Sequence, residues 1–326
     1  MTVSPDLAAL AATLRASRSF GAKEDIGLVA GRLGLSGASP VPVGDDCAAI
    51  PDGDGYLLFA IEGFMNEFVA GDPWFAGWCG VMVNLSDIAA MGGRPTAIVD
   101  ALWADGAEQA GPVLQGLRAA SERFGVPIVG GHSNLRTDRS QLSVAVLGRA
   151  RTLLTSFDAR PGDRLVAAID LRGRYREPFS NWEAATQAPA PRLRGDLELL
   201  PQIAEAGLSR AAKDISQGGI VGTAAMLAEC SGVGVEIDIR AVPMPEGVAP
   251  ERWLLTFPSF GYLLAVAAED VAAVTARFAA RGIAAAEIGA IAAGSEIAIT
   301  DGVARETIWN VVARPLLQCA PREAAA

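Results

Sequence analysis

The sequence is poor in the residues that several kinds of site require. Only four of its 326 residues are cysteines, and none lies in a C-x-x-C pair, which argues against a structural zinc site and favours free thiols in a reducing compartment. One histidine and two lysines, Lys23 and Lys213, stand beside 25 arginines. The formal net charge of −10 gives no basic footprint, so we expect no nucleic-acid partner.

Long apolar runs and the common nucleotide motifs are also absent. Polar and charged residues interrupt the apolar segments near Trp78 and Leu263, so we expect no membrane span. The first residues lack a basic start followed by an apolar core, so we expect a cytoplasmic protein without a signal peptide. G-x-G-x-x-G, G-x-x-x-x-G-K and G-x-S-x-G do not occur, which excludes a Rossmann fingerprint, a Walker A loop and a nucleophile elbow.

The chain has enough apolar material for two domains. Hydrophobic residues make up 51% and charged residues 20%, as in folded globular proteins, and the length allows two cores. We predict an α+β protein with domains at 1–150 and 151–326. In the first we expect helices at 5–18, 74–91 and 108–124, a glycine-, serine- and proline-rich mobile arm at 20–42, and strands at 56–61, 96–103, 126–129 and 142–147. In the second we expect strands at 164–169, 234–239, 261–267, 285–291 and 296–300, helices near 196–206, 220–230 and 270–281, and an insertion at 170–191.

Three acidic residues stand among apolar and small ones in the strings VGDDCAAI and NLSDIAAMGGRP: Asp45, Asp46 and Asp87. Carboxylates are costly to bury unless they are paired, hydrogen-bonded or bound to a cation. Mg²⁺ prefers a few carboxylates together with phosphate oxygens, so a metal–nucleotide enzyme is the first hypothesis. On the predicted helix at 74–91, Asn84 and Asp87 share a stripe beside the core face, where Asp87 could line a cleft.

Glycines accompany two further groups of polar residues. Gly130 and Gly131 would let a ligand approach the backbone beside His132, although an ordinary loop histidine remains an alternative. In the string KDISQGG, Asp214 or Ser216 could cap the following helix, and helix N-termini attract phosphate. A plain cap and turn explains this string equally well.

The strings VGDDCAAI, NLSDIAAMGGRP, VPIVGGHSN and KDISQGGIVGTAAMLAECSGVGVEID occur in the order seen in the aminoimidazole ribonucleotide (AIR) synthetase superfamily, which the chain resembles from about Gly44 to Gly289. That superfamily includes thiamine-monophosphate kinase and selenophosphate synthetase. The resemblance implies two α/β domains, the first of which forms a barrel-like sheet with a second subunit in a homodimer. It also implies ATP and Mg²⁺ as cofactors and transfer of the γ-phosphate to a small-molecule substrate.

On this resemblance we predict a site with three sets of residues. The metal ligands are Asp45, Asp46, Glu62, Asp87 and Asp214. The cofactor-binding residues are Gly44, Asp45, Asn84, Gly130, Gly131, His132, Ser216 and Gly218. The catalytic residues are Asp46, Asp87, Asp214 and Lys23, the last of which closes over the phosphates from the mobile arm.

Two departures leave the activity open. The kinase branch has aspartates where this chain has Glu62 and Gln217. The string IDLRGRYREPFSNWEAAT resembles AIR synthase-related proteins similar to methanogenesis marker protein 2, for which the sequence names no substrate. Thiamine-monophosphate kinase, a nucleotide-binding module without chemistry and a purely structural dimer therefore remain as alternatives.

Overall fold

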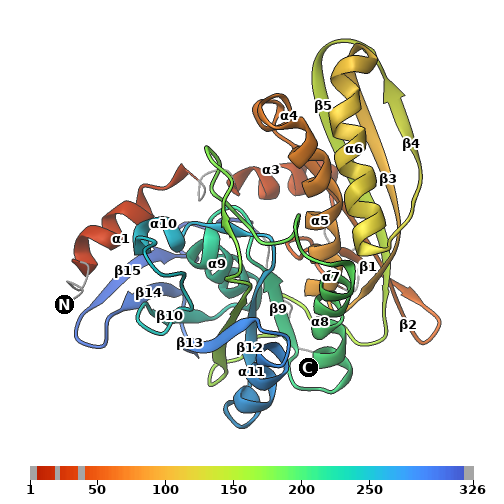
Figure 1. Cartoon of the computed structure of the whole chain (residues 1–326). Coiled ribbons are helices and arrows are strands. Elements are labelled where there is room, and N and C mark those ends of the chain that lie inside the picture. Colours follow the sequence, from red (N-terminus) through yellow and green to blue (C-terminus); the bar gives the residue numbers. More distant parts are fainter. Residues whose placement is uncertain (1–5, 19–22, 36–40, 319–326) are drawn as a thin grey trace. The chain divides into compact units, whose positions relative to one another are not determined.

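The computed structural model describes residues 6–18, 23–35 and 41–318. The chain forms two compact units, each assembled from separate stretches of sequence (Figure 1). The domain boundary predicted at residue 150 falls near one junction between these units, and the predicted domains stay a prediction. The first unit consists of Met1–Asp46, Leu154–Ala184 and Ala206–Ala326, and the second consists of Cys47–Leu153 and Ala185–Glu205.

The second unit is built on a five-stranded sheet in the order β1-β2-β5-β3-β4. Strands β3 and β4 pair in parallel, and the other neighbours are antiparallel. Two long helices, α5 and α6, pack against each other and against this sheet (Figure 1). The elements are β1 (Ala48–Asp52), β2 (Gly55–Phe64), α4 (Asn66–Gly71), α5 (Pro73–Ala90), β3 (Arg94–Asp105), α6 (Gly106–Phe124), β4 (Ile128–Asn134), β5 (Arg136–Ala150), α7 (Ala190–Leu197) and α8 (Leu199–Glu205).

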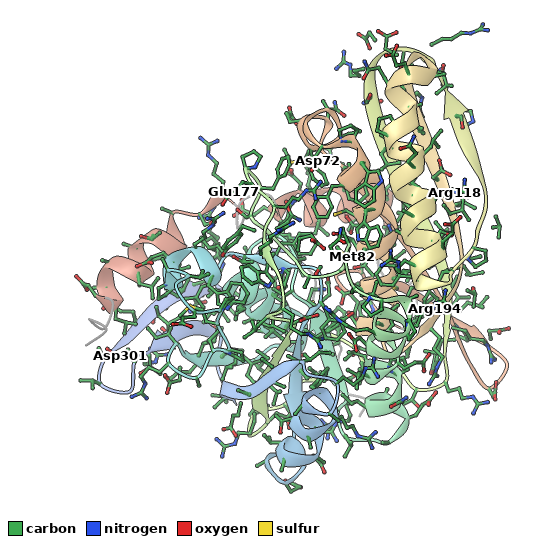
Figure 2. The ribbon with its side chains drawn as sticks, in the orientation of Figure 1. Asp72, Met82, Arg118, Glu177, Arg194 and Asp301 are labelled. Atoms are coloured by element: carbon green, nitrogen blue, oxygen red, sulfur yellow. The ribbon has the colours of Figure 1, made fainter. Side chains whose placement is uncertain are left out.

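Helix α5 is the buried centre of the second unit. Asp72 lies at its N-terminus (Figure 2). It caps the helix, because its Oδ1 accepts a hydrogen bond from the N–H of Phe75 at 3.3 Å, and Pro73 suits the first turn. Helix α6 approaches closely because Gly116 has no side chain: a Cβ there would lie 1.9 Å from the carbonyl oxygen of Trp74.

The first unit contains a seven-stranded sheet in the order β15-β14-β10-β13-β6-β12-β9 and a small sheet in the order β11-β8-β7. All six residues of β12 are buried, and the strand pairs with β6 on one side and β9 on the other. The strands are β6 (Arg164–Ile169), β7 (Arg174–Tyr175), β8 (Asn181–Glu183), β9 (Ala211–Asp214), β10 (Gly234–Asp238), β11 (Phe257–Pro258), β12 (Gly261–Val266), β13 (Ala284–Ala292), β14 (Glu296–Thr300) and β15 (Arg305–Asn310). The helices are α1 (Leu7–Arg15), α3 (Glu24–Leu33), α9 (Gly219–Ser231), α10 (Pro250–Trp253), the 3₁₀ turn η1 (Ala268–Asp270) and α11 (Val271–Ala279).

The mixed sheets and helices confirm the predicted α+β class, but two local predictions are wrong. Residues 20–22 and 36–40 of the predicted arm at 20–42 lie outside the described residues. The described part contains helix α3, because acidic residues in its first turn and Gly34 with φ of +64° at its end give it regular helix boundaries. The strand predicted to end at residue 129 continues as β4 through Asn134, so His132 is not in a loop. In the part of the chain that the structure describes, no helix has the length and apolar character needed to cross a membrane.

Candidate functional site

A tight turn in the first unit holds Asp45 in place. Gly44 before it has a backbone φ of +124°, which residues with a Cβ rarely adopt. Oδ2 of Asp45 accepts a hydrogen bond from the N–H of Ser156 at 2.9 Å, and Oδ1 accepts one from the Ser156 hydroxyl at 2.7 Å. The N–H of Asp46 also donates to Oδ1 of Asp45 at 3.0 Å. Because its carboxylate already accepts three hydrogen bonds from the protein, Asp45 is better suited to ordering this turn than to binding a metal.

The surroundings of Asp45 disfavour its charge. Burial raises the pKa of its carboxyl to about 6, and the adjacent charge of Asp46 adds to the rise. The ammonium group of Lys213 and the hydrogen bonds from Ser156 act in the opposite direction and offset part of the rise. A polar group that titrates near neutrality at a buried position is characteristic of functional sites, although ion-pair networks also produce it.

Lys213 is the counter-ion of this turn. It lies on β9, and its Nζ donates a hydrogen bond to Oδ1 of Asp46. Only 5% of each of the two side chains is exposed. Burial opposes the charged form of Lys213, but the carboxylates of Asp46, Asp45 and Asp214 outweigh it and raise the pKa of the amine. Lys213 is therefore a buried ammonium group that neutralises part of the acidic charge.

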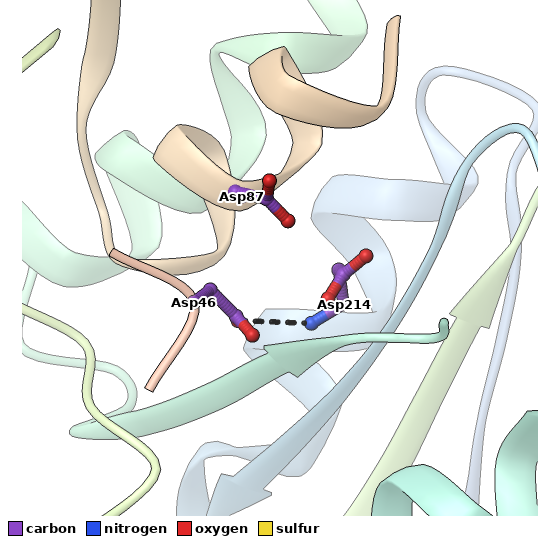
Figure 3. A group of neighbouring side chains, drawn as sticks. All are labelled: Asp46, Asp87 and Asp214. Atoms are coloured by element: carbon purple, nitrogen blue, oxygen red, sulfur yellow. Dashed lines mark hydrogen bonds between the residues drawn. The ribbon is translucent and has the colours of Figure 1, made fainter. Parts of the chain in front are cut away.

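Asp214 lies next to the Asp46–Lys213 pair. Its backbone N–H donates to Oδ2 of Asp46 at 3.3 Å (Figure 3). A carboxylate oxygen of Asp214 lies within 4.8 Å of one of Asp46, and Asp214 is only 4% exposed. Three carboxylates thus share one buried ammonium group. Hard oxygen donors with excess negative charge are what Mg²⁺ or another hard divalent cation prefers, so the donor set fits the predicted metal.

Helix α9 begins immediately after these residues. Its N-cap is Gly218, with φ of +111°, so the predicted cap by Asp214 or Ser216 is wrong. The helix starts at a pair of glycines because the chain packs closely against Leu254 there. Gly219 adopts a φ of +61°, and a Cβ on it would lie 2.2 Å from the carbonyl oxygen of Leu254. Nζ of Lys23 donates to Oγ of Ser216 at 3.5 Å. The start of α9 and a lysine from the N-terminal segment therefore meet beside the acidic residues.

The second unit holds the remaining acidic residues of the predicted site. Asp87 is 5% exposed on α5. Asn84 is fully buried, and its Nδ2 donates to the carbonyl of Gly80, one turn earlier, at 2.8 Å. Glu62 is half-buried on β2. Burial of Asp87 agrees with its predicted position at the edge of the core face, and the metal and cofactor roles of these residues stay predictions.

The glycine–histidine motif of the second unit has a structural explanation. His132 is exposed on β4, where it pairs with Ala101, and its ring centroid lies 6.0 Å from that of Trp103. A Cβ on Gly131 would lie 2.5 Å from the carbonyl oxygen of Asp100, so the strand pairing itself requires a glycine there. In the described part of the chain, only the neighbouring residues of Gly130 come within 4 Å of the place a Cβ on it would take. The structure therefore explains Gly131 without a ligand, and a binding role for the motif stays a prediction.

The structure brings together only part of the predicted set within one unit. The predicted site residues do not include Lys213 and Ser156, which contact Asp46 and Asp45. The scarcity of lysine was the signal that could have indicated Lys213, whereas nothing in the local sequence indicates Ser156. The predicted residues that the first unit gathers are Lys23, Gly44, Asp45, Asp46, Asp214, Ser216 and Gly218.

The chain matches the models of one protein family. Residues 44–150 match the model of the AIR synthase related protein N-terminal domain, and residues 174–302 match that of the C-terminal domain. An uncharacterised protein of Synechocystis sp. is 47% identical over 299 residues, which cover 90% of this chain and 92% of that protein. A thiamine-monophosphate kinase of Methanospirillum hungatei is 30% identical over 212 residues, which cover 62% and 70% of the two chains.

A solved structure of similar fold contains a nucleotide. PurL of T. maritima, complexed with ADP, matches with a TM-score of 0.72 and 20% identity. The match covers 86% of this chain and 47% of PurL, so this chain spans about half of that protein. At this identity the likeness shows the fold alone. The two family matches and the extent of the Synechocystis match confirm the predicted superfamily and its two-domain fold, and the chain belongs to the AIR synthase related protein family.

Proposed function

We propose that this protein is a Mg²⁺-dependent enzyme that transfers the γ-phosphoryl group of ATP to a small metabolite. The observation that carries the proposal is the set of Asp45, Asp46 and Asp214 around one buried ammonium group, that of Lys213. The remaining negative charge favours a divalent cation, and a nearby helix N-terminus favours a phosphate chain. A relative named as a thiamine-monophosphate kinase supports ATP as the phosphate donor.

The proposed roles follow from the contacts. Asp46 and Asp214 would bind the metal ion, and we assign Asp87 as a further ligand because of the family resemblance and its burial. Lys213 would orient Asp46, since it contacts Oδ1, while Asp45 would fix the turn through Ser156. Bound Mg²⁺ would offset the negative charge of the phosphates.

The phosphate chain would lie at the start of α9. Lys23 and Ser216, which contact each other there, would bind phosphate oxygens together with backbone N–H groups at the helix N-terminus. Phosphoryl transfer needs little covalent chemistry from the protein, so most of the rate would come from positioning the two reactants.

We also propose that the protein is a homodimer. The strand register puts Ile50, Phe59, Ile61, Val99 and Leu147 on one face of the five-stranded sheet, each between 37% and 67% exposed. The opposite face of β2 packs against α5. An exposed apolar sheet face of this kind is typical of a protein–protein interface, and it agrees with the dimer that the family resemblance implies.

Thiamine-monophosphate kinase remains the second candidate. The 30% identity to a protein of that name favours it. Gln217 opposes it, because an amide cannot supply the charge of the aspartate found in that branch.

Transfer of label from γ-³²P-ATP tests the proposal. The purified protein would be incubated with labelled ATP and pools of small metabolites, one pool containing thiamine monophosphate, with Mg²⁺ or with EDTA. We expect a labelled small molecule that forms only with Mg²⁺ and not with the Asp214→Asn variant. ATP binding without transfer to any pool would contradict the enzyme and favour a nucleotide-binding module.

A further inference from the structure

Helix α3 carries Lys23 at its N-cap, yet the helix has little burial of its own. The structure describes all of Glu24–Leu33, and none of these residues is buried. The apolar side chains of Leu28, Val29 and Leu33 are 54% to 66% exposed. A short helix without a buried face is marginal in water, so other contacts must fix its position.

Those contacts come from the other end of the chain. Oε1 of Glu24 pairs with the guanidinium group of Arg314 at 2.7 Å. A Cβ on Gly27 would lie 2.6 Å from the carbonyl oxygen of Leu317 and 2.5 Å from Cβ of Gln318, so the backbone of α3 touches this segment directly. We call residues 309–318 the C-terminal clasp.

The clasp is itself anchored. The guanidinium carbon of Arg314 lies 4.6 Å from the ring centroid of Trp309, and the Trp309 indole N–H donates to the carbonyl of Arg314 at 2.7 Å. Glu229, which is 6% exposed on α9, accepts hydrogen bonds from the backbone N–H groups of Leu316 and Leu317. A buried carboxylate with two backbone donors is a strong attachment point.

A continuous set of contacts therefore runs from α9 to the residues just before it. Glu229, near the end of α9, holds the clasp, and the clasp holds α3. The N-cap of α3 is Lys23, whose Nζ reaches Ser216 just before the start of α9. We propose that the C-terminal clasp positions Lys23 for phosphate binding, with Gly27, Arg314 and Glu229 as positioning residues. This inference rests on the proposed function, because it assigns Lys23 to a phosphate group.

Two glycines of α3 provide a matched pair of variants. Gly27 contacts the clasp, whereas a Cβ on Gly31, one turn later, would lie more than 4 Å from every described atom outside the backbone of its own helix and its chain neighbours. Gly27→Ala should displace α3 and weaken the binding of ADP·Mg²⁺ about as much as Lys23→Ala does. Gly31→Ala makes the same chemical change in the same helix and should leave the affinity unchanged. If Gly27→Ala does not fold, Arg314→Gln supplies the second variant, with Arg314→Lys expected to restore part of the affinity.

A double-mutant cycle separates positioning from a general structural effect. In a Lys23→Ala background, Gly27→Ala should weaken ADP·Mg²⁺ binding less than twofold further, because its effect passes through Lys23. An equal loss of affinity with and without Lys23 would overturn the inference. Equal affinities of the Gly27→Ala and Gly31→Ala proteins would overturn it as well.

Hydrogen exchange tests the clasp without any nucleotide. Amides of residues 24–33 should exchange faster in Gly27→Ala than in the wild type or in Gly31→Ala. If the wild type binds no ADP·Mg²⁺, the proposed function fails and the phosphate role of Lys23 fails with it. Unchanged exchange in Gly27→Ala would instead show that the clasp does not hold α3, whatever the protein binds.

Discussion

The Nζ of Lys213 donates a hydrogen bond to Oδ1 of Asp46, and 5% of each side chain is exposed. These residues are 167 positions apart in the sequence, and they join the N-terminal segment to β9. A buried ion pair contributes little relative to a well-packed apolar pair, but removing one partner leaves an uncompensated charge. A substitution at either residue should therefore change both the stability of the first unit and the charge of the candidate site.

The first prediction concerns this pair. Lys213→Met should lower the free energy of unfolding by about 3–5 kcal/mol in metal-free buffer, because it leaves buried carboxylates without their counter-ion. Mg²⁺ should restore part of this loss, since a cation that binds only the folded state stabilises it. Urea unfolding with and without Mg²⁺ measures both effects. Lys23→Met, at the only other lysine, should change stability much less, and equal losses for the two variants would contradict the role of Lys213.

The second prediction concerns pH. The pKa of Asp45 is about 6 in the folded protein and near 3.8 when unfolded, so between these values the folded state binds more protons. Ionisation of Asp45 therefore lowers stability as the pH rises from 4 to 7. Asp45→Asn keeps an acceptor for Ser156 and removes this charge. Its stability relative to the wild type should increase over that range by on the order of 1–3 kcal/mol. A difference that does not change with pH would contradict the raised pKa.

The third prediction concerns the exposed sheet face. Ile61→Glu places a charge on this face and should shift the protein from dimer to monomer in sedimentation velocity experiments. Val303→Glu is the control, because Val303 is 94% exposed between β14 and β15. A monomeric wild type would contradict the proposed homodimer. A dimer that survives Ile61→Glu would place the interface on a different surface.

The sequence predicts the elements that carry regular patterns. Helix α5 could be predicted because Pro73 suits its first turn, its residues are apolar or small, and a glycine pair ends it. Helix α3 could not, because glycines at 27 and 31 obscured its periodicity, and the structure shows that Gly27 serves a contact with Leu317 and Gln318. Such a contact depends on the fold and leaves no local signal.

Some residues of the candidate site can also be predicted from the sequence, whereas their contacts cannot. The acidic residues of the GDD and KDIS strings stand out because carboxylates are rare in apolar surroundings. The pairing of Asp46 with Lys213 and the hydrogen bonds from Ser156 to Asp45 join distant parts of the chain, so no local pattern predicts them. Gly131 shows the opposite case, in which a suggestive residue is explained by its contact with Asp100 across the sheet.

Thermal unfolding with a non-hydrolysable ATP analogue, with and without Mg²⁺, tests the central claim most directly. At about one hundred times the dissociation constant, the ligand should add roughly 2.7 kcal/mol and raise Tm by several degrees. We expect the wild type and the control Asp138→Asn, whose side chain is 80% exposed, to show this shift only with Mg²⁺. We expect Asp214→Asn and Asp87→Asn to lose it. A wild type without any shift, or an Asp214→Asn protein with the full Mg²⁺-dependent shift, would contradict a metal–nucleotide site at these carboxylates.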